Sequence, residues 1–130
     1  MVMVDTSVWV DFFHQRSTPD VKLFFRLARA GNVTTCDLIL HEVLRGFDDE
    51  KTRLHVMRVM DPLDCHEVLG KQRALQSATR YRDLRSRGVT VCKPNYAIIA
   101  SYCIDTRVPL LSSDKDFKGY VPIGLKLLRG

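Results

Sequence analysis

Short apolar runs alternate along the chain with segments in which apolar residues recur at helical spacing. Residues 1–4 are all apolar and the run stops at Asp5, which is typical of a parallel strand buried on both faces. Residues 33–36, 89–92 and 108–111 are further short β-rich or apolar runs. The pattern therefore predicts four short strands.

The segments between these runs predict helices. Thr18, Pro19 and Asp20 supply a capping hydroxyl, a proline at the first helical position and an acid in the first turn, and Gly31 ends that helix. Further helices are predicted from the residues after Asp5 to Phe13, and over residues 37–46, 48–60, 66–87 and 97–104. The side chains expected to face inward on the two middle helices are Leu54, Met57, Met60, Leu75, Ala78, Tyr81 and Leu84.

Strands that alternate with helices predict an α/β domain with a mainly parallel sheet flanked by helices. In open sheets of this kind, ligands bind beyond the carboxyl ends of the strands. Asp5 and Asp114 each follow an apolar run, Asp5 directly and Asp114 after two serines. These two acids, far apart in the sequence, are therefore expected to meet at one edge of the sheet.

The composition is that of one globular domain. Of 130 residues, 45% are hydrophobic and 27% are charged, which excludes a disordered or fibrous chain. No apolar run approaches the ~20 residues that cross a bilayer, and the first residues lack the basic region of a signal peptide. The four cysteines form no C-x-x-C pair and the four histidines show no zinc-ligand spacing. We therefore expect a single cytoplasmic domain over residues 1–130, with reduced thiols and no membrane partner.

The positive charge is concentrated in one stretch. The formal net charge is +5, and residues 71–93 contain seven basic residues and one acid. The residues that would contact a polyanion are Arg80, Arg82, Arg85, Arg87 and Lys93. A solvated basic helix and a surface that binds nucleic acid or an acidic protein are both compatible with this pattern.

Glu42 lies among apolar neighbours on a predicted helix, where a carboxylate needs compensation. An ion pair with Arg45 or Arg26 would provide it, and so would a metal ion shared with other acids. Asp5 is equally consistent with a helix cap. Clustered carboxylates without a thiol or histidine pattern favour Mg²⁺ or Mn²⁺, which assist phosphodiester hydrolysis.

Residues 3–11, 41–46 and 109–117 resemble, in order and spacing, the three sequence blocks of PIN-domain ribonucleases, and more narrowly of VapC-type toxins. The resemblance covers essentially the whole chain. It implies a PIN-like fold and a Mg²⁺-dependent endoribonuclease that cleaves transfer or ribosomal RNA. It also implies a homodimer, inhibited by a VapB-type antitoxin made from the same operon. Asp5, Glu42 and Asp114 fall on the acidic positions of the family, Asp116 falls on an accessory acid, and Thr6 falls on a hydroxyl that orients the first acid.

One block departs from the family pattern, because Tyr96 stands where the family has an aspartate. A phenol, with an ordinary pKa of about 10, supplies no carboxylate at neutral pH. Asn95 is expected to point about 100° away around the helix and not to replace the missing acid. We therefore predict a weak or inactive nuclease. The alternative is a binding module that sequesters antitoxin or RNA without cutting.

Aromatic side chains are abundant on the early helices. They are Trp9, Phe12, Phe13, Phe24 and Phe25. Core packing accounts for such residues in most proteins, but the family likeness also implies a groove in which an antitoxin lays an apolar segment.

Overall fold

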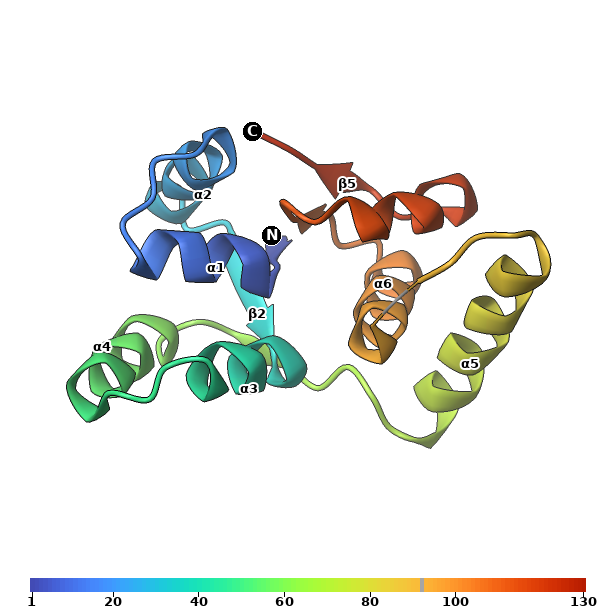
Figure 1. Ribbon diagram of the computed structural model, residues 1–130, viewed down its shortest axis with the longest axis horizontal. Coiled ribbons are helices and arrows are strands. Elements are labelled where there is room, and N and C mark those ends of the chain that lie inside the picture. Colours follow the sequence, from blue (N-terminus) through green and yellow to red (C-terminus); the bar gives the residue numbers. More distant parts are fainter. Residues whose placement is uncertain (92) are drawn as a thin grey trace.

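The computed structural model describes residues 1–91 and 93–130, and these form one parallel sheet flanked by helices (Figure 1). The strand order is β3-β2-β1-β4-β5, and every neighbouring pair is parallel. The strands are β1 (Val2–Val4), β2 (Val33–Cys36), β3 (Cys65–His66), β4 (Leu110–Leu111) and β5 (Leu127–Leu128). Met3, at the centre, lies opposite Thr34 on one side and Leu110 on the other. The predicted α/β class is confirmed.

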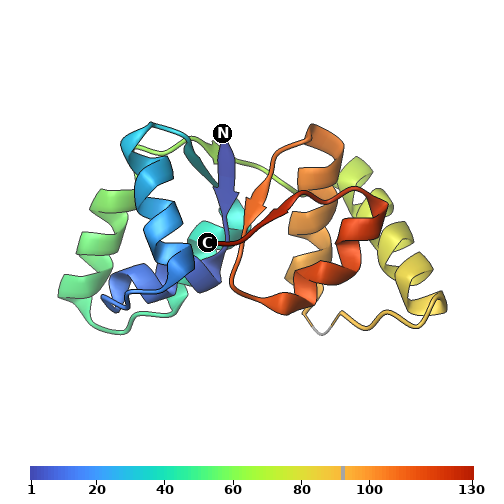
Figure 2. The ribbon, with the colours of Figure 1, turned by 90° about the horizontal axis from the view of Figure 1, so that it is seen from above.

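Helices cover both faces of this sheet. Helices α1 (Thr6–Phe13), α2 (Pro19–Arg29) and α4 (Glu50–Met60) lie on one side of the strands. Helices α5 (Lys71–Ser86) and α6 (Pro94–Thr106) lie on the other, as both ribbon views show (Figures 1 and 2). Helix α3 (Asp37–Arg45) follows β2, and the 3₁₀ helix η1 (Lys115–Ile123) follows β4.

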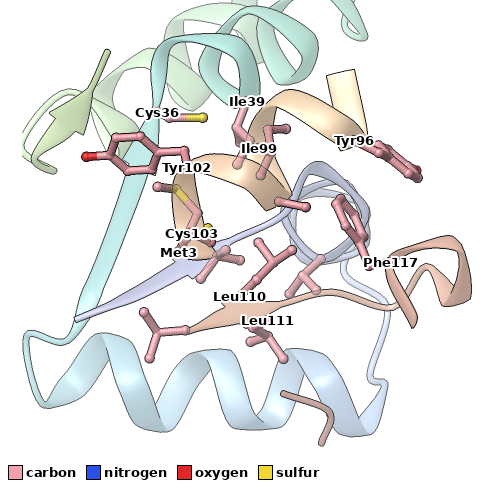
Figure 3. Close-up of a cluster of buried hydrophobic side chains, with 14 of the residues drawn as sticks. Met3, Cys36, Ile39, Tyr96, Ile99, Tyr102, Cys103, Leu110, Leu111 and Phe117 are labelled. Atoms are coloured by element: carbon pink, nitrogen blue, oxygen red, sulfur yellow. The ribbon is translucent and has the colours of Figure 1, made fainter. Parts of the chain in front are cut away.

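The core is built around β1, β4 and α6. Met3, Leu110, Leu111, Ile99 and Phe117 are fully buried, and Figure 3 shows them in one cluster of side chains from β1, β4, α6 and η1. Because the central strands are covered on both faces, their runs are wholly apolar instead of alternating. This arrangement fixes the carboxyl ends of β1 and β4 side by side.

The sequence pattern missed the shortest elements. Strands β3 and β5 have two residues each and η1 follows a polar turn, so none shows a readable period. Residues 89–91 were predicted as strand but are irregular, and residue 92 of that run lies outside the described residues. Helix α5 begins at Lys71 and not at residue 66, because Gly70 has a φ of 107° that interrupts a helix.

Two predicted inward faces were partly wrong. On α5, Leu84 is buried as predicted, but Leu75 is 60% exposed and Ala78 is exposed, because α5 packs mainly against α6 and turns Ser77 inward. On α4, Met60 is buried as predicted, but Leu54 and Met57 are exposed and Val56 is buried in their place. None of the helices in the described part of the chain is long and apolar enough to cross a membrane.

Candidate active site

The carboxyl ends of β1 and β4 bring two acids of the candidate site to one edge of the sheet, the lower edge in Figure 2. Asp5 follows β1 directly and caps α1, and its backbone N–H donates to Leu111 O on β4 at 2.9 Å. Asp114 follows β4 and caps η1. The topology therefore places these two residues as the sequence predicted.

Asp5 is buried and held by hydroxyl groups. Its Oδ2 accepts hydrogen bonds from Ser7 Oγ at 2.8 Å, from Ser112 Oγ at 3.0 Å and from the backbone N–H of Ser7 at 3.3 Å. Its Oδ1 is buried without a hydrogen-bond partner among the described residues. Burial raises the pKa of Asp5 and the negative charge of Glu42 raises it further, although the hydrogen bonds oppose this.

Ser7, and not Thr6, orients this acid. Ser7 Oγ donates to Asp5 and also accepts a hydrogen bond from the backbone N–H of Ser113 at 3.1 Å. Thr6 Oγ1 is buried and has no hydrogen-bond partner within residues 1–91 and 93–130. The supporting role expected for Thr6 is therefore carried by its neighbour, because Ser7 lies on the side of α1 that faces β4.

Tyr96 lies among Asp5, Glu42 and Asp114, which we call the acidic cluster. Its hydroxyl donates to Asp114 Oδ2, and its ring stacks on Phe117 with the ring centroids 4.2 Å apart (Figure 3). The side chain is almost fully buried. Burial raises the pKa of Tyr96, and the bond to Asp114 and the charges of Asp5, Asp114 and Glu42 raise it further. All three carboxylates are therefore near this hydroxyl, which stays protonated.

Asp114 is held on both oxygens. Besides the bond from Tyr96 to Oδ2, its Oδ1 accepts the backbone N–H of Asp116 at 2.9 Å. Burial alone would raise the pKa of Asp114, but these two bonds and the charges of Lys93 and Lys115 outweigh it, so the pKa is lowered. Asp116 supports the site through its backbone; its carboxylate makes no hydrogen bond or ion pair among the described residues.

Glu42 is held by the residue that we expected to point away. Asn95 Nδ2 donates to Glu42 Oε1 at 3.2 Å, because both residues 95 and 96 occupy the first turn of α6, where it faces α3. Neither Arg45 nor Arg26 forms an ion pair with Glu42 in the described part of the chain. Lys93, just before α6, donates to the Tyr96 hydroxyl at 3.4 Å.

The donor set is that of a magnesium site, but its arrangement is not. Carboxylate oxygens suit a hard cation, and the unpartnered Asp5 Oδ1 is the kind of atom that a cation would satisfy. Among the described residues, however, no three His, Cys, Asp or Glu side chains are grouped closely enough to hold a metal ion. Tyr96 donates to Asp114 and Asn95 donates to Glu42, so two of the three acids are engaged by side chains of this protein.

The basic residues of α5 are largely engaged elsewhere. Arg80 donates to Ser101 and to Asp105 on α6, the latter at 2.6 Å, which joins the two helices. Arg85 donates to Tyr81 Oη and Arg87 pairs with Asp83, both within α5 or its end. Arg82 is exposed. Arg80 is thus an ion-paired link between α5 and α6, which neither reading of the basic stretch predicted, and Lys93 reaches the acidic site.

A pocket lies away from the acids, between α1, α2 and α4. Its volume is about 780 Å³, and Phe12, Phe13, Val21 and Phe25 are its apolar lining. Trp9 and Phe24 are buried beneath it, and Phe25 is 47% exposed. We call this region the aromatic pocket.

Comparison with known proteins adds to the geometry. A model of the PIN domain matches residues 2–121. The VapC ribonuclease Mb1587 of Mycobacterium bovis and ribonuclease VapC11 of Mycobacterium tuberculosis are each 29% identical to this chain over 119 residues, which cover 90% of this chain and 89% of the relative.

Solved structures share the fold over nearly the full length. VapBC2 from Rickettsia felis, bound to a DNA fragment from its promoter, has a TM-score of 0.76 at 16% identity and covers 100% of this chain and 99% of its own. VapBC-5 from Mycobacterium tuberculosis has a TM-score of 0.70 at 22% identity, covering 99% and 98%. Since the domain match spans almost the whole chain and the fold agrees throughout, this chain belongs to the PIN domain family.

Proposed function

We propose that this protein is an endoribonuclease toxin of a VapBC-type pair, with an activity that Tyr96 keeps weak or absent. Its support is the PIN fold with Asp5, Glu42 and Asp114 at the family's acidic positions, and the VapC names of its relatives. The observation that carries the proposal is the hydrogen bond from the Tyr96 hydroxyl to Asp114, in the midst of all three acids. Its substrate is transfer or ribosomal RNA in the cytoplasm, and its cofactor, when position 96 is acidic, is Mg²⁺ or Mn²⁺.

Charge and shape both give Tyr96 this effect. An aspartate at position 96 would add a fourth carboxylate and leave both oxygens of Asp114 free of the phenol. Tyrosine removes that negative charge and places its ring against Phe117, with the hydroxyl on an acid that a cation would need. The chain as it stands therefore retains the acids of a nuclease in an arrangement that favours no ion.

The partner of this toxin is a VapB-type antitoxin. The aromatic pocket supports this part of the proposal, because a half-exposed phenylalanine above buried aromatic rings suits an apolar peptide segment. A second apolar groove of about 540 Å³ between α5 and α6 includes Leu69, Tyr81, Val91 and Ile98. We assign this groove to the homodimer, since Leu75 on the same helix is also exposed.

A second candidate function is a binding module that captures antitoxin or RNA without cutting. The bonds from Tyr96 to Asp114 and from Asn95 to Glu42 favour it, because both leave carboxylates satisfied within the protein. The aromatic pocket would serve this function equally well.

Restoring the acid tests the proposal. Tyr96→Asp should raise both Mg²⁺ affinity and RNA cleavage, the latter by about a hundredfold or more, the scale of removing an electrostatic contact to the reacting group. Calorimetric titration with Mg²⁺ gives the affinity without relying on activity, and cleavage is measured on total transfer and ribosomal RNA. Expression of the variant without antitoxin should arrest the host.

Tyr96→Phe is the matched control, because it keeps the ring and removes only the hydroxyl. It should free Asp114 but supply no carboxylate, so its Mg²⁺ affinity should fall between those of the parent and Tyr96→Asp. A parent chain that already cleaves RNA as fast as Tyr96→Asp at equal Mg²⁺ would overturn the effect assigned to Tyr96. If Tyr96→Asp binds Mg²⁺ and antitoxin but cuts no RNA, the binding-module function is the correct one.

A further inference from the structure

A second pocket is lined in part by Asp114 and is mainly basic. Its volume is about 510 Å³, and its lining residues are Ser7, Ser113, Asp114, Lys115, Lys118 and Arg129. Three of these six carry a positive charge and one carries a negative charge. The pocket shares Asp114 and Ser7 with the acidic cluster, so the two sites are adjacent. We call it the basic pocket.

The cations of this pocket are available to a ligand. Lys115 and Lys118 are exposed and form no ion pair within the described residues, whereas Arg80 is taken up by Asp105. Arg129 is loosely held, with its Nε 3.7 Å from Asp20 Oδ2. An ion pair at this distance leaves most of the guanidinium donors open.

The walls of the pocket are fixed by one buried carboxylate. Asp20, at the start of α2, accepts a hydrogen bond from Ser113 Oγ at 2.7 Å and one from the backbone N–H of Gly130 at 2.5 Å. It therefore ties the turn after β4 to the residues after β5, which cross toward the strand ends in Figure 2. Arg129 and Asp114 thus line one cavity.

We propose that the basic pocket binds a backbone phosphate of the RNA, next to the phosphodiester that faces the acids. The inference rests on the proposed function, since it names how that same site holds its substrate. Carboxylates alone repel a polyanion, and a strand that reaches Asp5 and Asp114 needs cations on a neighbouring phosphate. Lys115, Lys118 and Arg129 lie where that phosphate must pass, because they share the cavity with Asp114. The serine hydroxyl protons are already donated to Asp5 and Asp20, so the cations carry the contact.

The test compares two pairs of charge-removing substitutions in RNA binding without cleavage. Lys118→Gln with Arg129→Gln alters the basic pocket, and Arg82→Gln with Arg87→Gln removes the same charge from α5 and its C-cap. Lys115 is left intact, because its charge acts on Asp114. Binding of a fluorescein-labelled oligouridylate is followed by anisotropy in EDTA over a range of salt concentrations.

The pocket pair should weaken binding about tenfold at low salt and lower the salt slope by about 1.4, since each phosphate contact on a single strand contributes about 0.7. The α5 pair should change the affinity about twofold or less, as expected for charges that are only screened at a distance. Equal effects of the two pairs, or no effect of the pocket pair, would overturn the inference. Lys118→Gln alone guards against misfolding, because this side chain is exposed and makes no hydrogen bond or ion pair in the described chain.

A neutral backbone locates the contact more sharply. Oligouridylates with a single methylphosphonate linkage are scanned along the strand against both the parent and the pocket pair. One linkage should weaken binding to the parent several-fold and have no effect on the pocket pair, because the contact is then already lost. A penalty that persists in the pocket pair would show that the phosphate lies elsewhere. Cleavage by Tyr96→Asp is measured separately, so failure of the nuclease function is distinguished from failure of this subsite.

Discussion

The side chains of the acidic cluster are bound by other residues of this chain, whereas those of the aromatic pocket are partly exposed. At the strand ends, Asp5, Glu42 and Asp114 all accept hydrogen bonds from this chain's own Ser7, Ser112, Asn95 and Tyr96. In the aromatic pocket, Phe25 packs against Phe12 and Phe24 but remains nearly half exposed. We therefore expect the aromatic pocket to be more readily occupied by a partner than the acidic cluster is by an ion.

The largest effect should come from a substitution in the aromatic pocket. Phe25→Asp is expected to weaken binding of the product of the adjacent reading frame by about 2–4 kcal/mol, the range of aromatic hot spots at interfaces. Titration calorimetry measures this loss. Leu75→Asp on α5 is the control, because Leu75 is at least as exposed but lies outside the aromatic pocket. Equal losses from both substitutions would mean that general hydrophobicity, and not this pocket, provides the affinity.

Removing a hydrogen bond from the acidic cluster should lower the stability of the fold. Ser7→Ala removes the donor to Asp5 and the acceptor of the Ser113 N–H, so unfolding free energy should fall by about 1–3 kcal/mol. Thr6→Val is nearly isosteric and removes a buried hydroxyl that has no partner among the described residues, so it should be neutral or slightly stabilising. Urea unfolding of both variants checks the contrast. A larger loss from Thr6→Val would return the supporting role to Thr6.

The two acids at the strand ends should respond to pH with opposite signs. The pKa of Asp5 is raised, so the ionised form opposes folding, and Asp5→Asn should stabilise the metal-free protein at pH 7. That gain should vanish as the pH falls below the ordinary pKa of 3.8, where the parent is neutral in both states.

Asp114→Asn is the matched control for this prediction. The pKa of Asp114 is lowered, so its charge supports folding above its ordinary pKa and this support is lost as the pH falls through the lowered value. The variant should therefore be less stable than the parent at pH 7. Thermal unfolding in EDTA at several pH values measures both, and a shift of the same sign for both variants would contradict the assignment.

The sequence predicted the positions that follow from the order of strands in the sheet, but it missed the shortest strands and the packing of individual helices. The placement of Asp5 and Asp114 at one edge follows from two apolar runs in a parallel sheet, and it was predicted correctly. The strands of two residues carry no period, so β3 and β5 could not be read. The exposed Leu75 was missed because α5 packs mainly against one neighbour, and nothing within its own residues specifies that.

The contacts within the site were less predictable than its position. Ser7 and Thr6 are adjacent hydroxyls, and only the direction of α1 relative to β4 decides which one meets Asp5. Asn95 was assigned away from the site on helical spacing alone, but at the first turn of α6 it meets Glu42 on another helix. The basic pocket is assembled from residues after three different strands, and among its cations only Lys115 has a sequence signal, beside Asp114.

The hydrogen bond between Tyr96 and Asp114 also determines what fraction of the molecules has Asp114 free of the Tyr96 hydroxyl. We expect a cation to bind only in molecules whose Tyr96 hydroxyl has left Asp114, and a hydrogen bond to a charged acceptor holds the hydroxyl there with about 1.5–3 kcal/mol. The open form would then be about one molecule in ten to one in a hundred or fewer, and an apparent dissociation constant increases by the inverse of that fraction. Cation affinity in this protein therefore reports the conformational equilibrium of one side chain.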